Sequence, residues 1–434
     1  MKKWLFSSTD NSPLIIFRII FGLLITLECW GAILTGWVHR TLIEPKFTFS
    51  FINLEFLQPL PGYGMYFYFF LMGLLGVSIM LGYRYHLSII GFTILWAGAY
   101  LMQKSSYNNH YYLLFLINTL MCLLPANKNL SLDVKLKHVE PKNTMPNWCR
   151  FLIISQLFIV YTYAALAKFY PDWLNTTVAK NLMAGRKHFF IIGEMLQQKW
   201  AHHIITYTGI SFDLLIIPAL LYKKTRKWAF IISVFFHLYN SFILHIGIFP
   251  YMALGFTVFF FEPELIRKLF YPKTQKEIKI DQTNFKPSLP ILAFLIIWTT
   301  LQTALPLRHH FIEGNVLWTE EGHRLSWRMM LRSKSGYNKF YIVDTTNNIR
   351  TRIKLKEYLT KKQIRSMGGK PDMIWQFAQH LKKEYLKKGQ NIEVYVTNWT
   401  RVNNSKRKQL INPLINLADC EWNYWGHNDW ILLN

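Results

Sequence analysis

The sequence is poor in charged residues, and acidic residues are the scarcer kind. Only 17% of the 434 residues are charged, with 24 Asp and Glu against 49 Lys and Arg, while 51% are hydrophobic. Such a composition argues against a soluble protein and indicates one that resides in a membrane. The basic excess further predicts a negatively charged partner, which in so apolar a chain is a membrane surface or an acidic substrate rather than nucleic acid.

Cysteine is also rare, and a removable signal peptide is not evident. The four cysteines form no CxxC pair and no paired spacing, so neither a zinc site nor a disulfide framework is predicted. The N-terminal MKKWLFSSTDNSP is polar and lacks a short apolar core followed by a small-residue cleavage site. We therefore expect the first apolar run itself to direct the chain to the membrane.

Long apolar runs are what the sequence has in abundance. A helix that crosses a bilayer needs about 17–25 largely apolar residues. Runs near this length occur at 13–35, 63–82, 86–103, 111–125, 148–169, 204–222, 227–246, 249–262 and 289–306. They predict a polytopic α-helical membrane protein with about nine transmembrane helices, although 111–125 and 249–262 are short for a span.

The basic residues between these runs predict the orientation. With a cytoplasmic N-terminus, about 17 lysines and arginines fall on the cytoplasmic side and about 7 on the other. Cytoplasmic loops carry such an excess, so we expect an integral membrane protein with its N-terminus in the cytoplasm. An odd number of spans then places the C-terminal part outside, in a periplasm or lumen.

The pattern changes after residue 306. Residues 339–355 alternate like two strands around a TTNN turn, and 391–399 resemble a further strand. Residues 372–389 have the spacing of an amphipathic helix that stops at Gly389. We therefore expect a multi-helix transmembrane domain over 1–306 and a small extracytoplasmic α+β domain over 307–434 that covers the site.

One lysine stands at the end of an apolar run, in VYTYAALAKFYPDW. Ionisable residues at membrane depth mark functional sites more often than packing, so Lys168 is a candidate site residue. The alternative is a lysine whose amine reaches the lipid headgroups.

Two further polar groups interrupt the apolar runs. Asn109 and His110 lead one run in KSSYNNHYYLL, and FFHLYNSFILHIGIFPY contains His237, Asn240 and His245. Their alternatives are an interfacial aromatic belt and a buried polar network. Positions 237, 241 and 245 would share one helical stripe, but a metal site needs a third ligand, so no metal is predicted. The charge distribution places Lys168, His110 and His245 at one membrane face, which predicts an outward-opening pocket under the C-terminal domain.

Four motifs, in this order, carry a family resemblance. They are YNNHYYL, AALAKFYPDW, the HxxN and IGxFPY pair, and LWTEEGHRLSWRMMLRSKSG at 317–336. Together they resemble the vitamin K-dependent γ-glutamyl carboxylases and their bacterial relatives with the same horizontally transferred transmembrane domain. The resemblance extends from about residue 10 to the terminal LADCEWNYWGHNDWILL.

The resemblance implies a reaction with several co-substrates. Reduced vitamin K, as phylloquinol or menaquinol, would be deprotonated and would react with O2, and the resulting base would remove a γ-proton from peptidyl glutamate. The carbanion would add CO2, so that γ-carboxyglutamate and quinone epoxide form. The partners implied are a glutamate-containing peptide or protein and membrane lipids; the oligomeric state is left open.

The resemblance also assigns residues to roles. Lys168 is implied as the base, and burial favours the neutral amine that this role needs if no carboxylate lies beside it. Asn109 and His110 are implied as catalytic residues beside the quinone, where His237, Asn240 and His245 would complete the cofactor site. The residues implied to face the substrate are Trp318, His323, Ser326, Trp327, Arg332 and Lys334. Of these, Arg332 and Lys334 could hold a carboxylate, or could be solvated charges on a lid strand.

Three departures from the family pattern leave alternatives open. Ala167 stands where many animal members have a first lysine, His323 where they have tyrosine, and Arg328 where they have aspartate. These departures leave hydroquinone oxygenation better supported than carboxylation. The alternatives are a hydroquinone epoxidase of the same family that carboxylates nothing, or a non-catalytic membrane transporter or lipid-binding protein.

Overall fold

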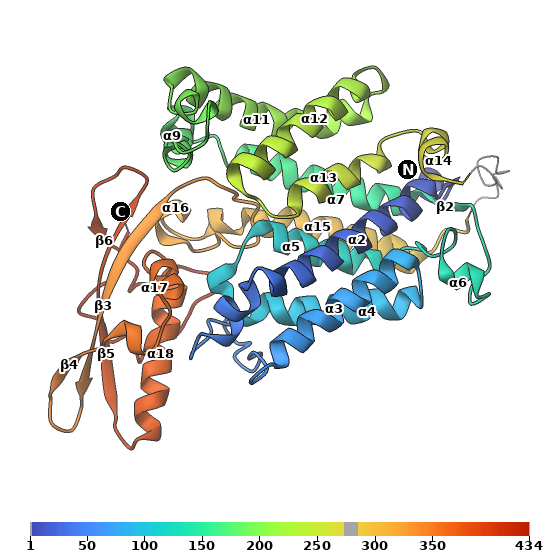
Figure 1. The fold of residues 1–434 in the computed structure, drawn as a ribbon. Helices are drawn as coiled ribbons and strands as arrows, with labels where there is room; N and C mark the ends of the chain where they lie inside the picture. The colour runs from blue at the N-terminus through green and yellow to red at the C-terminus, as the bar shows by residue number, and fades with distance from the viewer. Residues whose placement is uncertain (1, 273–284, 434) are drawn as a thin grey trace.

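A computed structural model describes residues 2–272 and 285–433 (Figure 1). Three of the lysines counted for the orientation, Lys273, Lys276 and Lys279, lie outside these ranges. The described chain forms a bundle of helices with a small sheet at one end, on the left of Figure 1. The N-terminus lies at the opposite end of the bundle.

Seven helices among the described residues are long and apolar enough to cross a membrane. They are α2 (Ser12–Leu34), α3 (Gly64–Leu81), α4 (Tyr85–Met102), α7 (Asn147–Leu166), α11 (Lys199–Leu221), α12 (Lys223–Leu244) and the segment Leu289–Phe311, in which α15 (Leu289–Ala304) continues as the 3₁₀ helix η5 (Leu305–Phe311). The two runs that were short in the sequence form shorter helices, α5 (Asn109–Met121) and α13 (Phe249–Phe256) with the 3₁₀ turn η3 (Thr257–Phe259). The prediction of a multi-helix membrane protein is confirmed, with seven of the nine predicted runs forming full-length helices.

Short elements connect the long helices. The helical ones are α1 (Lys2–Leu5), η1 (His39–Ile43), η2 (Lys104–Ser106), α6 (Leu132–Lys135), α8 (Pro171–Leu174), α9 (Thr177–Ala184), α10 (Ile192–Met195), α14 (Pro263–Phe270) and α16 (Val316–Thr319). The strands β1 (Ser8–Asp10) and β2 (Thr144–Pro146) pair antiparallel beside the N-terminus.

The C-terminal domain is an antiparallel sheet with helices on one face. The strand order is β4-β3-β5-β6, for β4 (Arg350–Arg352), β3 (Lys334–Asp344), β5 (Ile392–Val402) and β6 (Lys408–Gln409). The helices are η6 (Leu355–Glu357), α17 (Lys361–Met367) and α18 (Pro371–Lys387). Side chains alternate between the two faces of a strand, so Phe340 on β3 points inward and packs edge-on against Phe377 of α18 at 4.9 Å. The predicted strands and helix of this domain are confirmed.

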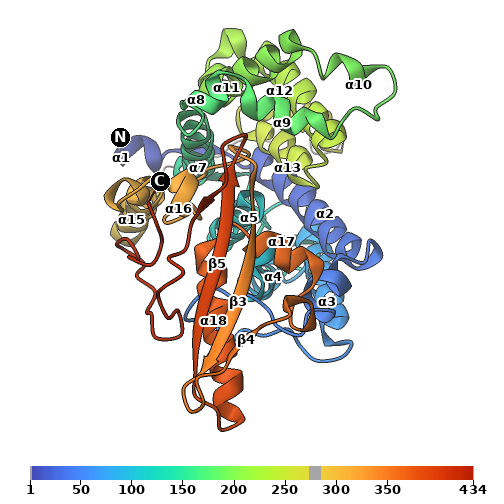
Figure 2. The same cartoon turned by 90° about the vertical axis from the view of Figure 1, so that its left-hand side faces the viewer.

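The domain is fixed to one end of the bundle by a buried carboxylate. Asp372, at the start of α18, lies 2.8 Å from the Lys104 amine in the α4–α5 connection and 2.5 Å from the Arg324 guanidinium. Burial alone would raise the pKa of Asp372, but the two cations hold it well below its usual range. In Figure 2 the sheet therefore lies across the end of the bundle, and residues 317–334, here called the lid loop, run between them.

Candidate functional site

A cavity of about 420 Å³ lies among the helices close to the C-terminal domain, and most of its wall is apolar. Residues of α5, α7, α11, α12 and α13 line it, together with Met329 and Met330 of the lid loop. The polar side chains in the wall include His110, Tyr161, Lys168, Asp213, His237 and Asn240. The structure thus brings four of the predicted site residues into one chamber, called the Lys168 cavity below.

Lys168 lies just beyond the last turn of α7. Its side chain is buried, with 7% of the residue exposed, so the amine does not reach out to the surface as the headgroup alternative requires. The amine donates to the Ala164 carbonyl at 3.0 Å and to the Asp213 carboxylate, and it lies 5.4 Å from the centre of the Trp173 ring. The expectation of an amine without a nearby carboxylate is wrong, because α11 packs beside α7 and presents Asp213 to it.

Asn109 and His110 are the first two residues of α5, and their side chains make different contacts. The Asn108 side chain caps this helix by accepting from the Tyr111 N–H at 2.8 Å. The His110 ring stacks on Phe249 at 4.1 Å and faces the Lys168 cavity. Asn109 instead accepts from the Tyr107 hydroxyl and donates to the Arg328 carbonyl, and it does not line that cavity.

The predicted stripe on α12 is only partly formed. His237 is buried with its Nε2 3.2 Å from the Tyr161 hydroxyl, and Asn240 lines the Lys168 cavity. The helix ends at Leu244, where His245 adopts a left-handed conformation with φ +56°. The prediction that His245 continues the stripe is therefore wrong, and His245 does not line the Lys168 cavity.

A second cavity, of about 240 Å³, adjoins the first under the lid loop. It is rich in cations and is called the Arg328 cavity below; its lining includes Asn109, His110, Glu320, His323, Arg324, Arg328, Arg332 and Lys370. His110, Met329 and Met330 line both cavities. These three residues therefore form the boundary between an apolar chamber and a cationic one.

The lid loop reaches this boundary through a constrained backbone. Glu320, Leu325, Trp327 and Met330 all have φ between +51° and +67°, a region that side-chain-bearing residues rarely adopt and that clusters at functional sites. The Trp327 ring is fully buried and stacks on Tyr112 at 4.8 Å. Trp327 thus holds the loop to α5 and lines neither cavity.

The side chains of Ser326 and Trp318 form hydrogen bonds to backbone carbonyl groups. The Ser326 hydroxyl donates to the His323 carbonyl at 2.5 Å, and the Trp318 indole donates to the Leu432 carbonyl at 2.8 Å. Neither side chain lines the Arg328 cavity, whereas His323 does. Of the six residues expected to face the substrate, only His323 and Arg332 line the Arg328 cavity.

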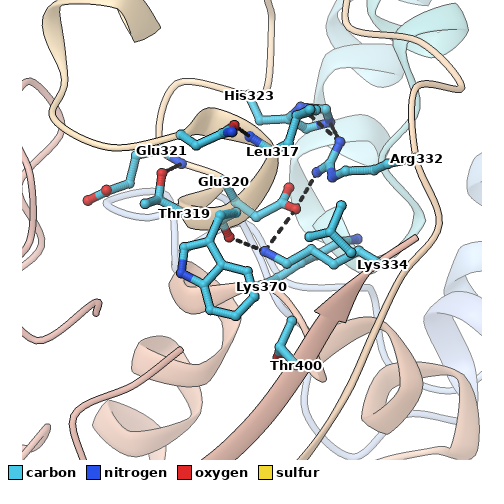
Figure 3. Close-up of polar contacts among 12 residues, drawn as sticks. Leu317, Thr319, Glu320, Glu321, His323, Arg332, Lys334, Lys370 and Thr400 are labelled. Atoms are coloured by element: carbon cyan, nitrogen blue, oxygen red, sulfur yellow. Dashed lines mark hydrogen bonds and ion pairs between the residues drawn. The ribbon is translucent and has the colours of Figure 1, made fainter. Parts of the chain in front are cut away.

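The two cations expected to hold a substrate carboxylate already hold one from this chain (Figure 3). Glu320 accepts from Arg332, and the Lys334 amine lies 3.2 Å from the same carboxylate while donating to the Trp318 carbonyl. Burial would raise the pKa of Glu320, but Arg332 and Lys334 outweigh it and hold that pKa well below its usual range. Glu320 was not among the site residues predicted from the sequence.

Two other cations of the Arg328 cavity have no carboxylate partner among the described residues. The Arg328 guanidinium lies 3.2 Å from His309, and the Lys370 amine donates to the Ser366 hydroxyl at 3.0 Å. Burial, followed by the charge of Arg324, lowers the pKa of Lys370 to about 8, and burial lowers the pKa of Arg328 to about 10. An anion entering this cavity would find these two groups.

Comparison with known protein families covers nearly the whole chain. The HTTM domain matches residues 6–265, and the lumenal domain of vitamin K-dependent gamma-carboxylase matches residues 288–434. The chain belongs to the vitamin K-dependent carboxylase family. No solved structure matches the chain. Membership of the vitamin K-dependent carboxylase family indicates a carboxylase-type membrane enzyme, and the lumenal-domain match includes both the lid loop and the sheet.

Proposed function

We propose that this protein uses reduced vitamin K, O2 and CO2 to convert peptidyl glutamate to γ-carboxyglutamate, with formation of the quinone epoxide. The observation that carries the proposal is the shared boundary of two unlike cavities. Lys168 and His110 line an apolar chamber, and His110 also lines a chamber of cations. A lipid-soluble reductant and an acidic peptide side chain would meet at that boundary.

The Lys168 cavity fits a prenylated quinone. Its wall is largely apolar, as small-molecule sites usually are, and a few polar groups converge on it. Lys168, His110, His237 and Asn240 would contact the ring oxygens, and the buried His237 Nδ1 has no hydrogen-bond partner in the described structure. When bound, the reduced quinone would supply, with O2, the strong base that removes the γ-proton of glutamate.

Lys168 and Asp213 would act as one unit in this chamber. The pair has no net charge whether the proton resides on Nζ or on the carboxylate. A proton can therefore move between them without leaving an isolated charge in apolar surroundings, which would be unfavourable by several kcal/mol. Passing its proton to Asp213 would free the Lys168 amine to accept another from a hydroquinone hydroxyl.

The substrate carboxylate would bind Arg328 and Lys370. Arg332 and Lys334 are occupied by Glu320, while Arg328 and Lys370 face the cavity without an anionic partner among the described residues. A planar guanidinium and an ammonium that line the same cavity suit a carboxylate. His110 and His323 line the same cavity, next to where the γ-carbon would lie.

The orientation predicted from the loops belongs to this proposal. Residues 1–306 would form the membrane domain with a cytoplasmic N-terminus, and residues 307–434 would lie in the periplasm or lumen. The quinone and O2 would then enter from the lipid, and the peptide from the aqueous side.

An incorporation assay tests the proposal. Purified protein in lipid nanodiscs would be incubated with vitamin K hydroquinone, labelled bicarbonate and a glutamyl peptide, with Lys168→Ala as control. We expect label in the peptide and an equal amount of epoxide. Peptide label no higher than in the control would refute carboxylation.

The second candidate function is hydroquinone epoxidation without carboxylation. The occupation of Arg332 and Lys334 by Glu320 favours it, since part of the cationic site is already neutralised. Epoxide formation at the same rate with and without the glutamyl peptide, together with no label in the peptide, would establish this alternative.

A further inference from the structure

A third cavity, also of about 420 Å³, reaches His110 and has no part in the proposed reaction so far. Its polar lining comprises Glu28, Asn108, His110, Tyr111 and His245, and it is called the Glu28 cavity below. It shares His110, Ile246, Phe249 and Met330 with the Lys168 cavity, but neither Lys168 nor Asp213 lines it. His110 therefore adjoins a second group of ionisable side chains.

Glu28 is an unusual residue for its position. It lies within α2, one of the seven long apolar helices, where a carboxyl group is unfavourable and usually belongs to a proton or ion path. Its Oε1 accepts from the Tyr111 hydroxyl at 2.6 Å. No cation pairs with it among the residues that the structure describes.

Tyr111 is held so that its hydroxyl stays at Glu28. The Trp96 indole donates to the Tyr111 carbonyl at 3.3 Å. The Tyr111 ring also meets Trp96 edge-on at 5.2 Å and Trp37 edge-on at 6.4 Å. Two indoles thus fix the phenol, which in turn fixes the carboxyl group that faces the cavity.

The proposed reaction releases a proton that must leave the site, and this cavity could receive it. Replacing a C–H bond by a carboxylate with CO2 releases one proton for each product formed. That proton must leave a site from which bulk water is kept away, because water would quench the strong base. Because His110 lines the Glu28 cavity as well as the Lys168 cavity, a proton on His110 could leave through the Glu28 cavity, whose wall includes five polar side chains and which is large enough to hold water.

We propose that Glu28 accepts the proton released in each turnover from His110, through water in the Glu28 cavity. The inference rests on the proposed function. In the transfer an N–H bond of the protonated His110 ring breaks, an O–H bond forms on the Glu28 carboxylate, and no electron changes hands. The titratable groups that face Glu28 are Tyr111 and His110 from α5, His245 at the end of α12, and Cys29 beside it on α2.

Glu28→Gln tests the transfer, because glutamine keeps the shape but cannot carry the proton. We expect kcat to fall about tenfold or more, the KM for the glutamyl peptide to stay within about twofold, and formate to restore part of the rate by entering the cavity as a mobile acid. Glu140→Gln, at an exposed position, is the matched control and should retain wild-type kcat. A Glu28→Gln enzyme with wild-type kcat, or a loss that formate does not relieve, would overturn the proposal.

Tyr111→Phe provides a second variant in which the carboxyl group remains. We expect a smaller fall in kcat than for Glu28→Gln and an altered pH profile of kcat, with only the small fall in the unfolding midpoint that the loss of one hydrogen bond causes. A parallel fall in the unfolding midpoint and in kcat, with the pH profile unchanged, would indicate a structural role and contradict the proposal.

A labelling experiment on the enzyme without quinone separates the two proposals. A hydrophobic carbodiimide reacts with protonated carboxyl groups that are open to an apolar or mixed cavity, and peptide mass spectrometry locates the adduct. We expect an adduct at Glu28 that increases as the pH falls. An unreactive Glu28 would refute the relay alone, whereas wild-type enzyme that forms neither epoxide nor labelled peptide would refute the proposed function.

Discussion

The Lys168 cavity and the Arg328 cavity adjoin each other but differ in how their charged side chains are paired. The first contains one cation and one anion that neutralise each other, in walls that are mainly apolar. The second gathers several cations around Glu320, and neither Arg328 nor Lys370 forms an ion pair with a carboxylate among the described residues. The difference indicates that a neutral molecule suits one chamber and an anion the other, and the proposed reaction would then take place where the two chambers meet.

The largest effect is expected from removing Lys168, the proposed base. Lys168→Ala should lower both epoxide formation and peptide carboxylation by about 10²–10⁴-fold, the usual contribution of a positioned acid–base group. Epoxide analysis by chromatography and label incorporation would measure the two products. Asp213→Asn should lower both rates as well, and wild-type rates in this variant would show that the pair does not act as a unit.

Removing a cation of the Arg328 cavity should weaken carboxylation of the peptide while leaving epoxide formation nearly unchanged. Arg328→Gln should raise the KM for the glutamyl peptide about 10–100-fold, because a charged hydrogen bond contributes about 1.5–3 kcal/mol. Epoxide formation measured without peptide should change little. Lys361→Gln, at an exposed position on α17, is the control. Equal losses of epoxidation and carboxylation in Arg328→Gln would remove the distinction between the two cavities.

The pH dependence of peptide binding should reveal Lys370. Because burial lowers its pKa to about 8, Lys370 carries its charge below pH 8 and loses it as the pH rises above that value. The KM for the peptide should therefore rise above about pH 8 by several-fold. Lys370→Arg keeps the charge and should flatten this part of the profile. An identical rise in both proteins would assign the titration to another group.

The smallest effect is expected at Trp318, a residue that sequence reasoning placed against the substrate. Trp318→Phe removes the hydrogen bond to the Leu432 carbonyl, so the free energy of unfolding should fall by about 1 kcal/mol. Thermal unfolding would measure this change, while the KM values for peptide and quinone should stay within about twofold. A large rise in the peptide KM would restore Trp318 to the substrate site.

Local sequence patterns predicted most of the architecture. For the candidate site they indicated residues such as Lys168, but not the side chains that these residues contact. Apolar runs and strand alternation depend on near neighbours in the chain, so the helices, the sheet and the family resemblance could be read directly. Asp213 is the only acidic residue in the run 204–222 and could have been noted on that ground. Its contact with Lys168 depends on how two distant helices pack, which no local pattern contains.

The errors have a similar origin. His245 shares a four-residue spacing with His237, but the chain leaves the helix at Leu244, and periodicity gives no information beyond the last helical residue. Glu320 precedes Arg332 by twelve positions, and only the turns of the lid loop bring the two together. Arg332 and Lys334, which were predicted to hold a substrate carboxylate, are instead paired with Glu320.

Asp372 limits how the peptide can arrive. Swinging the C-terminal domain away from the bundle would separate the Asp372 carboxylate from the Lys104 amine, both of which are shielded from water, and breaking a buried pair of this kind is typically unfavourable by about 3–5 kcal/mol. Domain and bundle are therefore expected to behave as a single rigid body during catalysis. A glutamate would then be presented on an exposed turn or an unfolded stretch, with its side chain extended inward, and one in a compact folded surface would remain unmodified.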